Sequence, residues 1–203
     1  MTFCIYLTHP NVDIDPARPV SQWNLSDKGR ARLEQGLSQP WLTQVDHVVC
    51  SSEKKALETG QVLAGHLGME LTTAPNLQEN NRDATGYLPK EEFEQVADEF
   101  FARPAVNIRG WERALDAQNR IVKAITSVLK DTVDNESVLF VGHGGVGTLL
   151  KCHLANTAIA RAHDQPNGGG YWFSFPKTAL QTLSLPLEKL AWQPIEVRQT
   201  QKA

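Results

Sequence analysis

Two histidines stand directly after apolar runs of the sequence, where a side chain is well placed to do chemistry. His9 follows FCIYLT at residues 3–8, and His143 follows SVLFVG at residues 137–142. A neutral imidazole carries a lone pair that can attack an electrophilic centre. If both runs are parallel strands of one sheet, their carboxyl ends meet at the edge where ligands bind in open α/β proteins. Either histidine alone would more often be a packed side chain, but the matched pair favours one shared site.

Three further stretches carry groups that suit an anionic ligand. GHGGVG places glycines, including Gly144, and helix N-terminal amides beside His143. SSEKKALETG brings Lys55 to the start of a helix, and the polar loop QENNRDATGYLP carries Glu79, a candidate general acid. Each stretch alone also fits an ordinary explanation, as a capped helix, a solvated basic turn or an exposed glutamate.

These residues must be positioned by alternating strands and helices. We expect strands at 3–8, 45–51, 69–75, 137–142, 171–175 and 179–185, and helices at 26–37, 53–67, 90–103, 111–131 and 144–155. This alternation predicts an α/β fold, a three-layer sandwich whose mostly parallel central sheet has helices on both faces. No repeat or linker divides the chain, so we expect one domain over 1–203, with a polar tail from about residue 196.

The composition excludes several other classes of protein. The 203 residues carry a formal net charge of -3 with scattered Lys and Arg, which disfavours a nucleic-acid binder. The three cysteines lack C-x-x-C spacing, which argues against a disulfide framework and a structural zinc site. Neither a signal-peptide pattern nor an apolar run near the roughly 18 residues of a membrane span is present. We expect a cytoplasmic protein that binds neither nucleic acid nor membrane; the sequence is compatible with a homodimer.

In their order along the chain, the motifs resemble those of the histidine phosphatase superfamily, the phosphoglycerate-mutase-like proteins. The family's first strand ends in Arg-His-Gly, where this chain has THP at residues 8–10, and Leu-Ser-x-x-Gly follows as LSDKG. SSEKKALETG is similar to Ser-x-x-x-Arg-Ala-x-x-Thr-Ala, with Lys55 in place of the arginine. Leu77 and Glu79 match Leu-x-Glu, and FVGHGG matches the last motif. Such an ordered set over residues 3–150 is more specific than any one motif.

The resemblance implies a phosphomonoester hydrolase that acts on a small phosphorylated molecule, releases free phosphate and needs no cofactor or metal. His9 would attack the phosphoryl group and carry it as phosphohistidine, with its other ring nitrogen bonded to a backbone carbonyl. Lys55 and His143 would hold the phosphoryl oxygens beside Gly144. Glu79 would protonate the leaving oxygen and then activate water. A mutase is disfavoured because NVDIDPARPV lacks the family's Glu-Ser-x-x-Asn segment.

Two departures from the family pattern lower the positive charge of the expected site. Thr8 and Lys55 replace arginines at two positions where we expect contact with phosphate, and neither offers the planar fork that grips two phosphate oxygens. In one interpretation Arg82, Arg161 or His163 supplies the missing phosphate contact. In the other, the chain is a weak or inactive phosphatase that binds phosphate or a phosphorylated ligand. An α/β hydrolase or a nucleotide-binding protein is disfavoured because the sequence has no G-x-S-x-G elbow and no P-loop with Gly-Lys-Ser/Thr.

Overall fold

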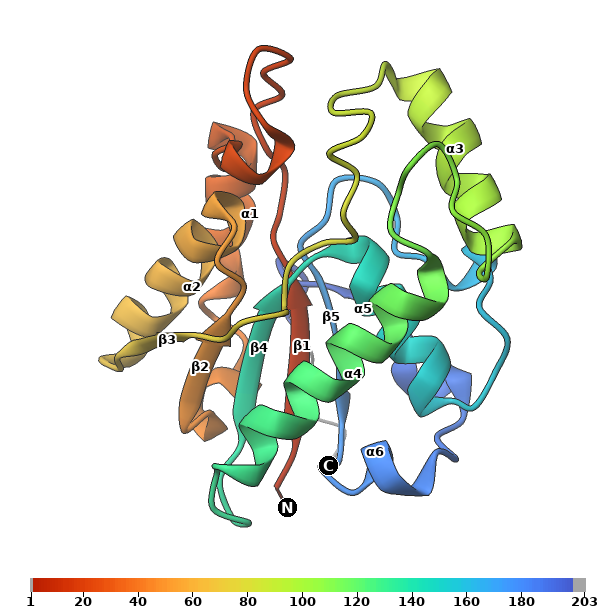
Figure 1. The fold of residues 1–203 in the computed structure, drawn as a ribbon. Helices are drawn as coiled ribbons and strands as arrows, with labels where there is room; N and C mark the ends of the chain where they lie inside the picture. The colour runs from red at the N-terminus through yellow and green to blue at the C-terminus, as the bar shows by residue number, and fades with distance from the viewer. Residues whose placement is uncertain (1, 199–203) are drawn as a thin grey trace.

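The computed structural model describes residues 2–198, and these form one mixed sheet flanked by helices. Within them the sheet has six strands in the order β3-β2-β4-β1-β5-β6. The strands are β1 Cys4–Thr8, β2 His47–Cys50, β3 Leu71–Thr73, β4 Val138–Gly142, β5 Tyr171–Phe175 and β6 Gln193–Pro194. The first four strands are parallel, whereas β5 runs antiparallel to β1 and β6 antiparallel to β5. The carboxyl ends of β2, β4 and β1 therefore lie side by side (Figure 1).

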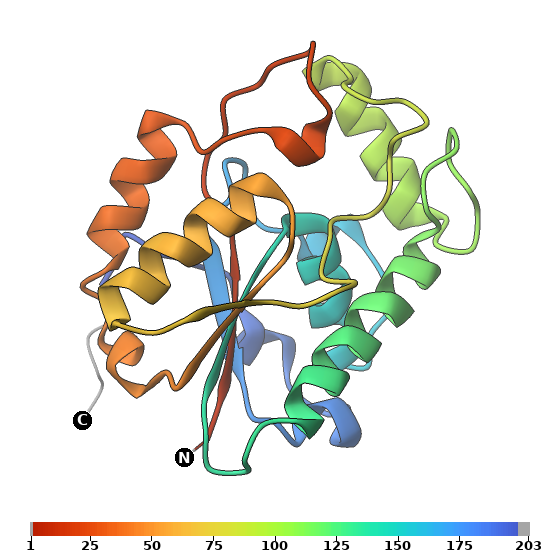
Figure 2. The ribbon, with the colours of Figure 1, turned by 60° about the vertical axis from the view of Figure 1, so that its left-hand side comes forward.

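Helices cover both faces of the sheet (Figures 1 and 2). They are α1 Asp27–Gly36, α2 Lys54–Leu67, α3 Lys90–Ala102, α4 Ala114–Lys130, α5 Gly144–Leu154 and α6 Ala179–Thr182. Leu33 of α1 and Leu63 of α2 pack in one core cluster, and Ile121 of α4 and Leu149 of α5 pack in the other. The predicted three-layer α/β sandwich is confirmed. In Figure 1, α3 stands above the carboxyl ends of the strands.

Strand β4 shows why one run of the sequence is continuously apolar. Phe140 packs in the core cluster of α4 and α5, whereas Leu139 and Val141 pack in the cluster of α1 and α2. A strand between two helical layers has no solvated face, so every position favours an apolar side chain or glycine. All five residues of β4 are buried. The strand therefore holds its next residue, His143, in a fixed place.

Helix ends follow ordinary capping chemistry. The Ser26 hydroxyl accepts the amide N–H of Gly29 at 3.2 Å, so α1 begins where the sequence predicts. Helix α2 ends at Leu67. Its C-cap residue, Gly68, has a φ of 67°, in the left-handed region that favours glycine. These local signals determine where α1 begins and where α2 ends.

The region after β5 differs from the prediction. The strand expected over 179–185 is wrong, because Ala179–Thr182 form the short helix α6 and Leu183 has a left-handed φ of 45°. The alternation in ALQTLSL also fits a single helical turn, and Ala179 is fully buried there. The strand that pairs with β5 is instead β6, which is too short for a periodic pattern in the sequence to reveal.

The described end of the chain is held against the body of the protein. Glu196 pairs with Arg32 at 2.8 Å, so the predicted polar tail from about residue 196 is anchored where it starts. Residues 199–203 of that tail lie outside the described part of the chain. Among the described helices, none has the length and apolar character needed to cross a bilayer.

Candidate active site

Three neighbouring strands deliver the residues that follow them to one place above the sheet. Ser51 follows β2, His9 follows β1 and His143 follows β4. The ring centroids of His9 and His143 lie 5.2 Å apart in an edge-to-face arrangement. The His9 amide donates to the Gly142 carbonyl at 3.0 Å, which extends the pairing of β1 and β4 to this point. The prediction that the two imidazoles meet is confirmed.

The His9 ring is neutral and keeps one nitrogen free. Its Nδ1 lies 2.9 Å from the Pro10 carbonyl, which can only accept, so Nδ1 carries the proton and Nε2 carries the lone pair. Burial and then the positive charge of Lys55 lower the pKa of His9 to about 4, against the opposing bond to Pro10. His9 lines a cavity of about 350 Å³. Its Nε2 is therefore in the state that a nucleophile requires.

A glycine turn from the distant C-terminal half holds the backbone of His9. The Gly170 amide donates to the His9 carbonyl at 2.9 Å. Gly169 has a φ of 63°, and a Cβ on it would lie 2.1 Å from that same carbonyl oxygen. Only glycine allows this approach, so the NGGG sequence serves to position the first histidine.

The shifted histidines predict a stability profile. We expect the free energy of unfolding to fall as pH drops from about 6.5 to about 4. In this range unfolded His9 binds a proton at its ordinary pKa of 6.5, whereas folded His9 stays neutral until about pH 4; the unfolded state binds more protons, so stability rises with pH. Burial of His143 acts in the same direction. Denaturant unfolding should give a slope of up to about 1.4 kcal/mol per pH unit for each histidine. The slope of the unfolding free energy against pH should be smaller for His9→Asn than for the wild type; equal slopes would contradict this prediction.

His143 is fully buried, and only one of its two ring nitrogens has a hydrogen-bond partner among the described residues. Its Nε2 lies 2.8 Å from the Ser51 hydroxyl. Its Nδ1 is buried and has no hydrogen-bond partner among residues 2–198. Burial lowers the pKa of His143 well below the usual value. A buried ring nitrogen without a partner is costly in a folded protein, and an oxygen of a bound ligand would satisfy it.

Glu79 is seated at the N-terminus of α5. Its carboxylate accepts the amide N–H groups of Gly145, Val146 and Asn80, each at 3.0 Å. Amides in the first turn of a helix have no intrahelical partner and attract an anion. A Cβ at Gly145 would lie 2.7 Å from Oε1 of Glu79, so a side chain here would displace the Glu79 carboxylate. Glu79 lines the same cavity as His9.

This close approach makes Gly145→Ala a test of the Glu79 position. We expect kcat to fall by about 10- to 100-fold, because displacing a catalytic group by about 1 Å can cost that much. The melting temperature should change little, since the end of the Glu79 side chain can move aside. Gly65→Ala is the matched control: a Cβ at Gly65 has no atom within 4 Å. An unchanged kcat with a lowered melting temperature would contradict the assignment.

Lys55 is buried and paired. Its ammonium group contacts the Glu53 carboxylate and donates to the Val20 carbonyl at 2.9 Å. Burial lowers the pKa of Lys55, and Glu53 opposes that shift. Lys55 is not among the residues that line the cavity of His9. The charge of Lys55 acts on both His9 and His143 while it is held by a carboxylate, and its contact with a phosphoryl oxygen stays a prediction.

Glu53 is a residue of the site that the sequence analysis missed. Its Oε2 contacts Lys55, its Oε1 accepts the Glu79 amide at 2.9 Å, and Oε1 lies 3.7 Å from Nε2 of His143. Burial would raise the pKa of this carboxyl, but His143, Lys55 and the Glu79 amide outweigh burial and hold it below its usual range. The sequence offered one signal for Glu53, because it is an acidic residue directly before a helix that starts with two lysines.

Thr8 is fully buried, and Gln165 occupies the space beside it. The Thr8 hydroxyl accepts the Tyr171 amide at 3.0 Å and donates to Oε1 of Gln165 at 2.6 Å. Gln165 lines the cavity, as does Gly144, and a Cβ on Gly144 would lie 2.3 Å from Nε2 of Gln165. The prediction that Thr8 itself contacts phosphate is therefore corrected. Thr8 orients a neutral amide donor, which sequence spacing did not reveal.

Because this space is filled, Thr8→Arg should harm the protein. We expect a loss of at least about 1–3 kcal/mol in the free energy of unfolding from overpacking, and weaker binding of inorganic phosphate because Gln165 is displaced. Thr8→Ser keeps the hydroxyl and is the control. Denaturant unfolding and calorimetric titration with phosphate measure both effects. Tighter phosphate binding by Thr8→Arg would show that the space can accept a cation after all.

Arg82 is the candidate cation that the structure leaves free. It lines the cavity of His9, and its charge contributes to the lowered pKa of that ring. Its guanidinium lies over the rings of Phe93 and Trp111, at 5.1 and 5.7 Å from their centroids. Within residues 2–198 it has no carboxylate partner. Of the cations named from the sequence, Arg82 is thus best placed to meet a phosphate.

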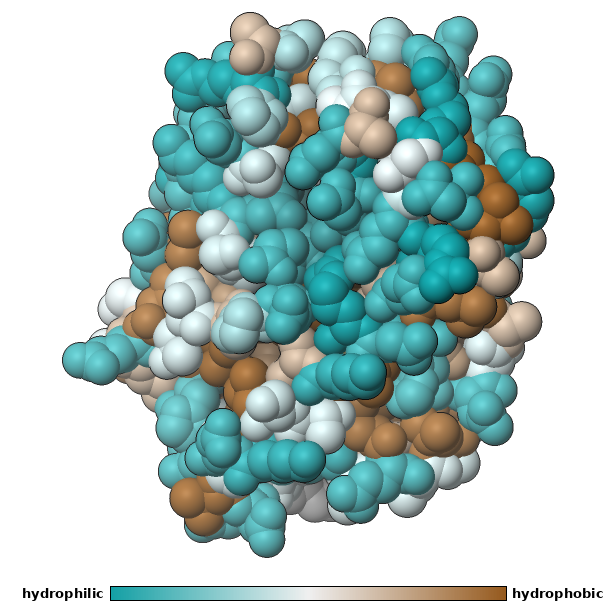
Figure 3. All heavy atoms as spheres, in the orientation of Figure 1, coloured by the Kyte–Doolittle hydropathy of each residue, from teal (hydrophilic) through white to brown (hydrophobic). Residues whose placement is uncertain are grey.

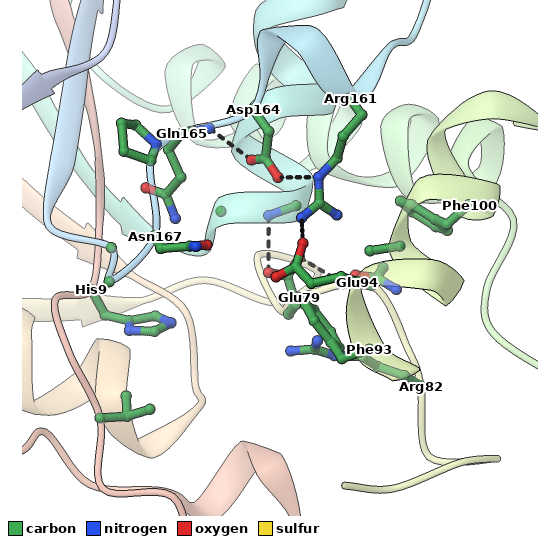
Figure 4. Close-up of a pocket in the computed structure, with 18 of the residues that line it drawn as sticks. His9, Glu79, Arg82, Phe93, Glu94, Phe100, Arg161, Asp164, Gln165 and Asn167 are labelled. Carbon is green, nitrogen blue, oxygen red and sulfur yellow. Dashed lines mark hydrogen bonds and ion pairs between the residues drawn. The ribbon is translucent and has the colours of Figure 1, made fainter. Parts of the chain in front are cut away.

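Arg161 and His163 are placed differently from the sequence expectation. Figure 4 shows Arg161 turned toward Glu94 and Asp164 on the wall of the cavity away from His9, at 2.6 and 3.5 Å. Its charge is thus already balanced. His163 is not among the residues that line this cavity. The ion pairs of Arg161 and the position of His163 disfavour the expectation that either supplies the missing phosphate contact, which stays a prediction.

The fold and the histidine pair define a phosphatase-like α/β protein. The family model for the histidine phosphatase superfamily (branch 1) matches residues 17–184, and the chain belongs to this superfamily. The match begins after His9, so the place of that residue rests on the strand end and ring contact described above. Among curated proteins, no sequence matches the chain significantly.

Solved structures with a similar fold include phosphatases. Mycobacterial glucosyl-3-phosphoglycerate phosphatase in complex with inorganic phosphate has a TM-score of 0.73 and 16% identity, covering 97% of this chain and 100% of that one. YhfR from Bacillus stearothermophilus has a TM-score of 0.72 and 22% identity, covering 86% and 90%. A phosphoserine phosphatase variant from Entamoeba histolytica with phosphoserine gives 0.71 and 15%, covering 86% and 90%. These likenesses extend over nearly the whole fold.

Proposed function

We propose that the chain hydrolyses phosphomonoesters through a phosphohistidine formed on His9, without a metal. One observation carries the proposal: a neutral imidazole whose Nε2 carries the lone pair lines a cavity beside a second, buried imidazole whose Nδ1 has no hydrogen-bond partner among residues 2–198. Membership of the histidine phosphatase superfamily supports it. The complexes of structural neighbours with phosphate and phosphoserine support a phosphorylated ligand.

The reaction uses two transfers at one phosphorus atom. Nε2 of His9 attacks phosphorus and the N–P bond forms as the P–O ester bond breaks; Glu79, in the fraction of molecules whose carboxyl group carries a proton, gives that proton to the leaving oxygen. A water molecule then attacks the phosphohistidine. Glu79 takes a proton from this water, the N–P bond breaks, and inorganic phosphate leaves. His9 and Glu79 return to their starting states.

The remaining groups bind the phosphoryl oxygens. Nδ1 of His143, which has no partner among residues 2–198, donates to one oxygen while Nε2 of the same ring accepts from the Ser51 hydroxyl. Arg82 supplies the guanidinium charge, and Nε2 of Gln165 supplies a neutral donor from the opposite side. Lys55 adds long-range positive charge from behind. Donors fixed in advance stabilise the charge that develops during phosphoryl transfer.

A second candidate function is phosphate binding without turnover. The observation that favours it is the low free charge: Lys55 is paired with Glu53, and Thr8 is neutral and turned to Gln165. Such a protein would recognise a phosphorylated ligand with the same cavity and leave it intact.

Phosphate release and ligand-induced stabilisation separate the two candidates. With chelator present and 4-nitrophenyl phosphate as substrate, the hydrolase releases phosphate continuously, and His9→Ala releases none above background. The binding protein shows a melting temperature raised by inorganic phosphate and no release. The absence of both effects would refute the two proposals together.

A further inference from the structure

A second, mostly apolar compartment adjoins the active-site cavity. This compartment has a volume of about 260 Å³ and shares Ile14, Arg82 and Phe93 with the active-site cavity. Its other walls come from the segment after β1 and the loop before α3: Val20, Trp23, Gly86, Tyr87, Leu88 and Lys90. Figure 3 shows apolar atoms recessed among hydrophilic ones at the top of the molecule, where these segments meet. A ligand whose phosphate lies at His9 can extend into this compartment.

The walls of the compartment suit a flat apolar group. The rings of Trp23 and Tyr87 lie 6.1 Å apart at 58°, and Phe93 presents a third ring beneath the guanidinium of Arg82. Aromatic side chains bury a large apolar area when they contact another apolar surface, and this burial favours binding. Ile14 at the shared wall is 61% exposed, so a bound apolar group would remove this surface from water.

The charges around the active-site cavity disfavour a second anionic group close to the phosphate. Glu94 and Asp164 both line it, and they balance Arg161. The phosphate itself would bind Arg82, which is the one arginine lining the cavity that has no carboxylate partner among the described residues. Lys90 lines the compartment and not the active-site cavity. A carboxylate a few bonds from the phosphate would thus face Glu94 and Asp164, and residues 2–198 line the cavity with no further arginine or lysine that lacks an acidic partner.

We propose that the substrate is a phosphomonoester of an uncharged, apolar alcohol, with an aromatic or similar flat group seated against Trp23, Tyr87 and Phe93. This inference rests on the proposed hydrolase and names its substrate class. It sets this chain apart from neighbours crystallised with phosphoserine and 3-phosphoglyceric acid, which carry a carboxylate near the phosphate.

Three esters of unactivated alcohols test the substrate class without a difference in leaving-group chemistry. We expect kcat/KM for 2-phenylethyl phosphate to exceed that for ethyl phosphate by about 10- to 100-fold, from burial of the phenyl ring. 3-Phosphoglycerate should be no better than ethyl phosphate. Equal values for the two alkyl esters, or a preference for 3-phosphoglycerate, would overturn the inference.

Variants of the compartment locate the effect. Leu88→Ala and Trp23→Ala should each lower kcat/KM for 2-phenylethyl phosphate by about 5- to 50-fold and leave ethyl phosphate unchanged, which also shows that the variants are folded. Val133→Ala is the control, because Val133 is 61% exposed and lies outside both cavities. If neither variant alters the ratio of the two substrates, the apolar group binds elsewhere and the inference fails.

A binding measurement separates this inference from the proposed hydrolase. If none of the three esters is hydrolysed, the hydrolase proposal fails, and calorimetry then compares 2-phenylethyl phosphate with ethyl phosphate as ligands. The inference still requires about 10-fold or tighter binding of the phenylethyl ester, reduced in Leu88→Ala. Equal affinities would refute the apolar subsite independently of turnover.

Discussion

Replacing His9 with alanine should lower kcat for a phosphomonoester by about 10⁴-fold or more, the size of effect seen when a covalent nucleophile is removed. Alanine removes the Nε2 lone pair, and no other ring nitrogen takes its place, since the Nδ1 of His143 lies in a buried ring whose Nε2 contacts Ser51. Steady-state phosphate release measures the change. The loss should appear in kcat, because bond formation to the nucleophile is made only in the transition state and after it.

Two controls make this result specific. His66→Ala removes an exposed imidazole from α2 and should leave kcat unchanged. The His9→Ala variant should still bind inorganic phosphate, since Arg82 and His143 remain. A His9→Ala variant with more than about a tenth of the wild-type rate would mean that another residue, or water alone, attacks the phosphorus.

Replacing Arg82 with alanine should weaken binding of inorganic phosphate by about 10- to 100-fold. A hydrogen bond to a charged group contributes roughly 1.5–3 kcal/mol, and Arg82 is the cavity arginine that is not committed to a carboxylate within residues 2–198. Calorimetric titration gives the dissociation constant, and kcat/KM should fall by a similar factor. Arg82→Lys should restore part of the binding, because it keeps the charge but not the planar fork.

Two other arginines test whether position or charge alone matters. Arg113→Ala removes an exposed guanidinium that pairs with Asp116 and should not alter phosphate binding. Arg161→Ala should weaken it by less than Arg82→Ala, because Glu94 and Asp164 already balance Arg161. If the Arg161 variant loses more affinity than the Arg82 variant, the phosphate lies on the other side of the cavity.

The fold could be predicted because its signals are local. Continuous apolar runs marked the buried strands β1 and β4, and Ser26 marked the start of α1. The parallel arrangement then placed His9 and His143 at one edge, since adjacent parallel strands end together. The failures lie near the C-terminus, where ALQTLSL fits either a strand or a helical turn and tertiary packing of Ala179 decides.

The electrostatics of the site could not be predicted in the same way. Lys55 matched a cationic position in the motif, but its charge is balanced by Glu53, two residues earlier, which no periodic pattern singles out. Gln165 reaches Thr8 from a loop 157 residues away. Arg82 was one of several candidates, and only the ion pairs of the folded chain show that Arg161 is occupied while Arg82 is not. Pairing between distant loops is set by the fold and not by the motif.

The central claim is that His9 carries the phosphoryl group, and trapping that group tests it most directly. Wild-type protein is mixed with a ³²P-labelled phosphomonoester, denatured within milliseconds, and the protein-bound label is exposed to acid and to alkali. We predict label that acid releases and alkali does not, as expected for a nitrogen–phosphorus bond, and that is absent from His9→Ala. Wild-type protein that turns over substrate without any acid-labile label, or a His9→Ala variant that retains it, would contradict the account.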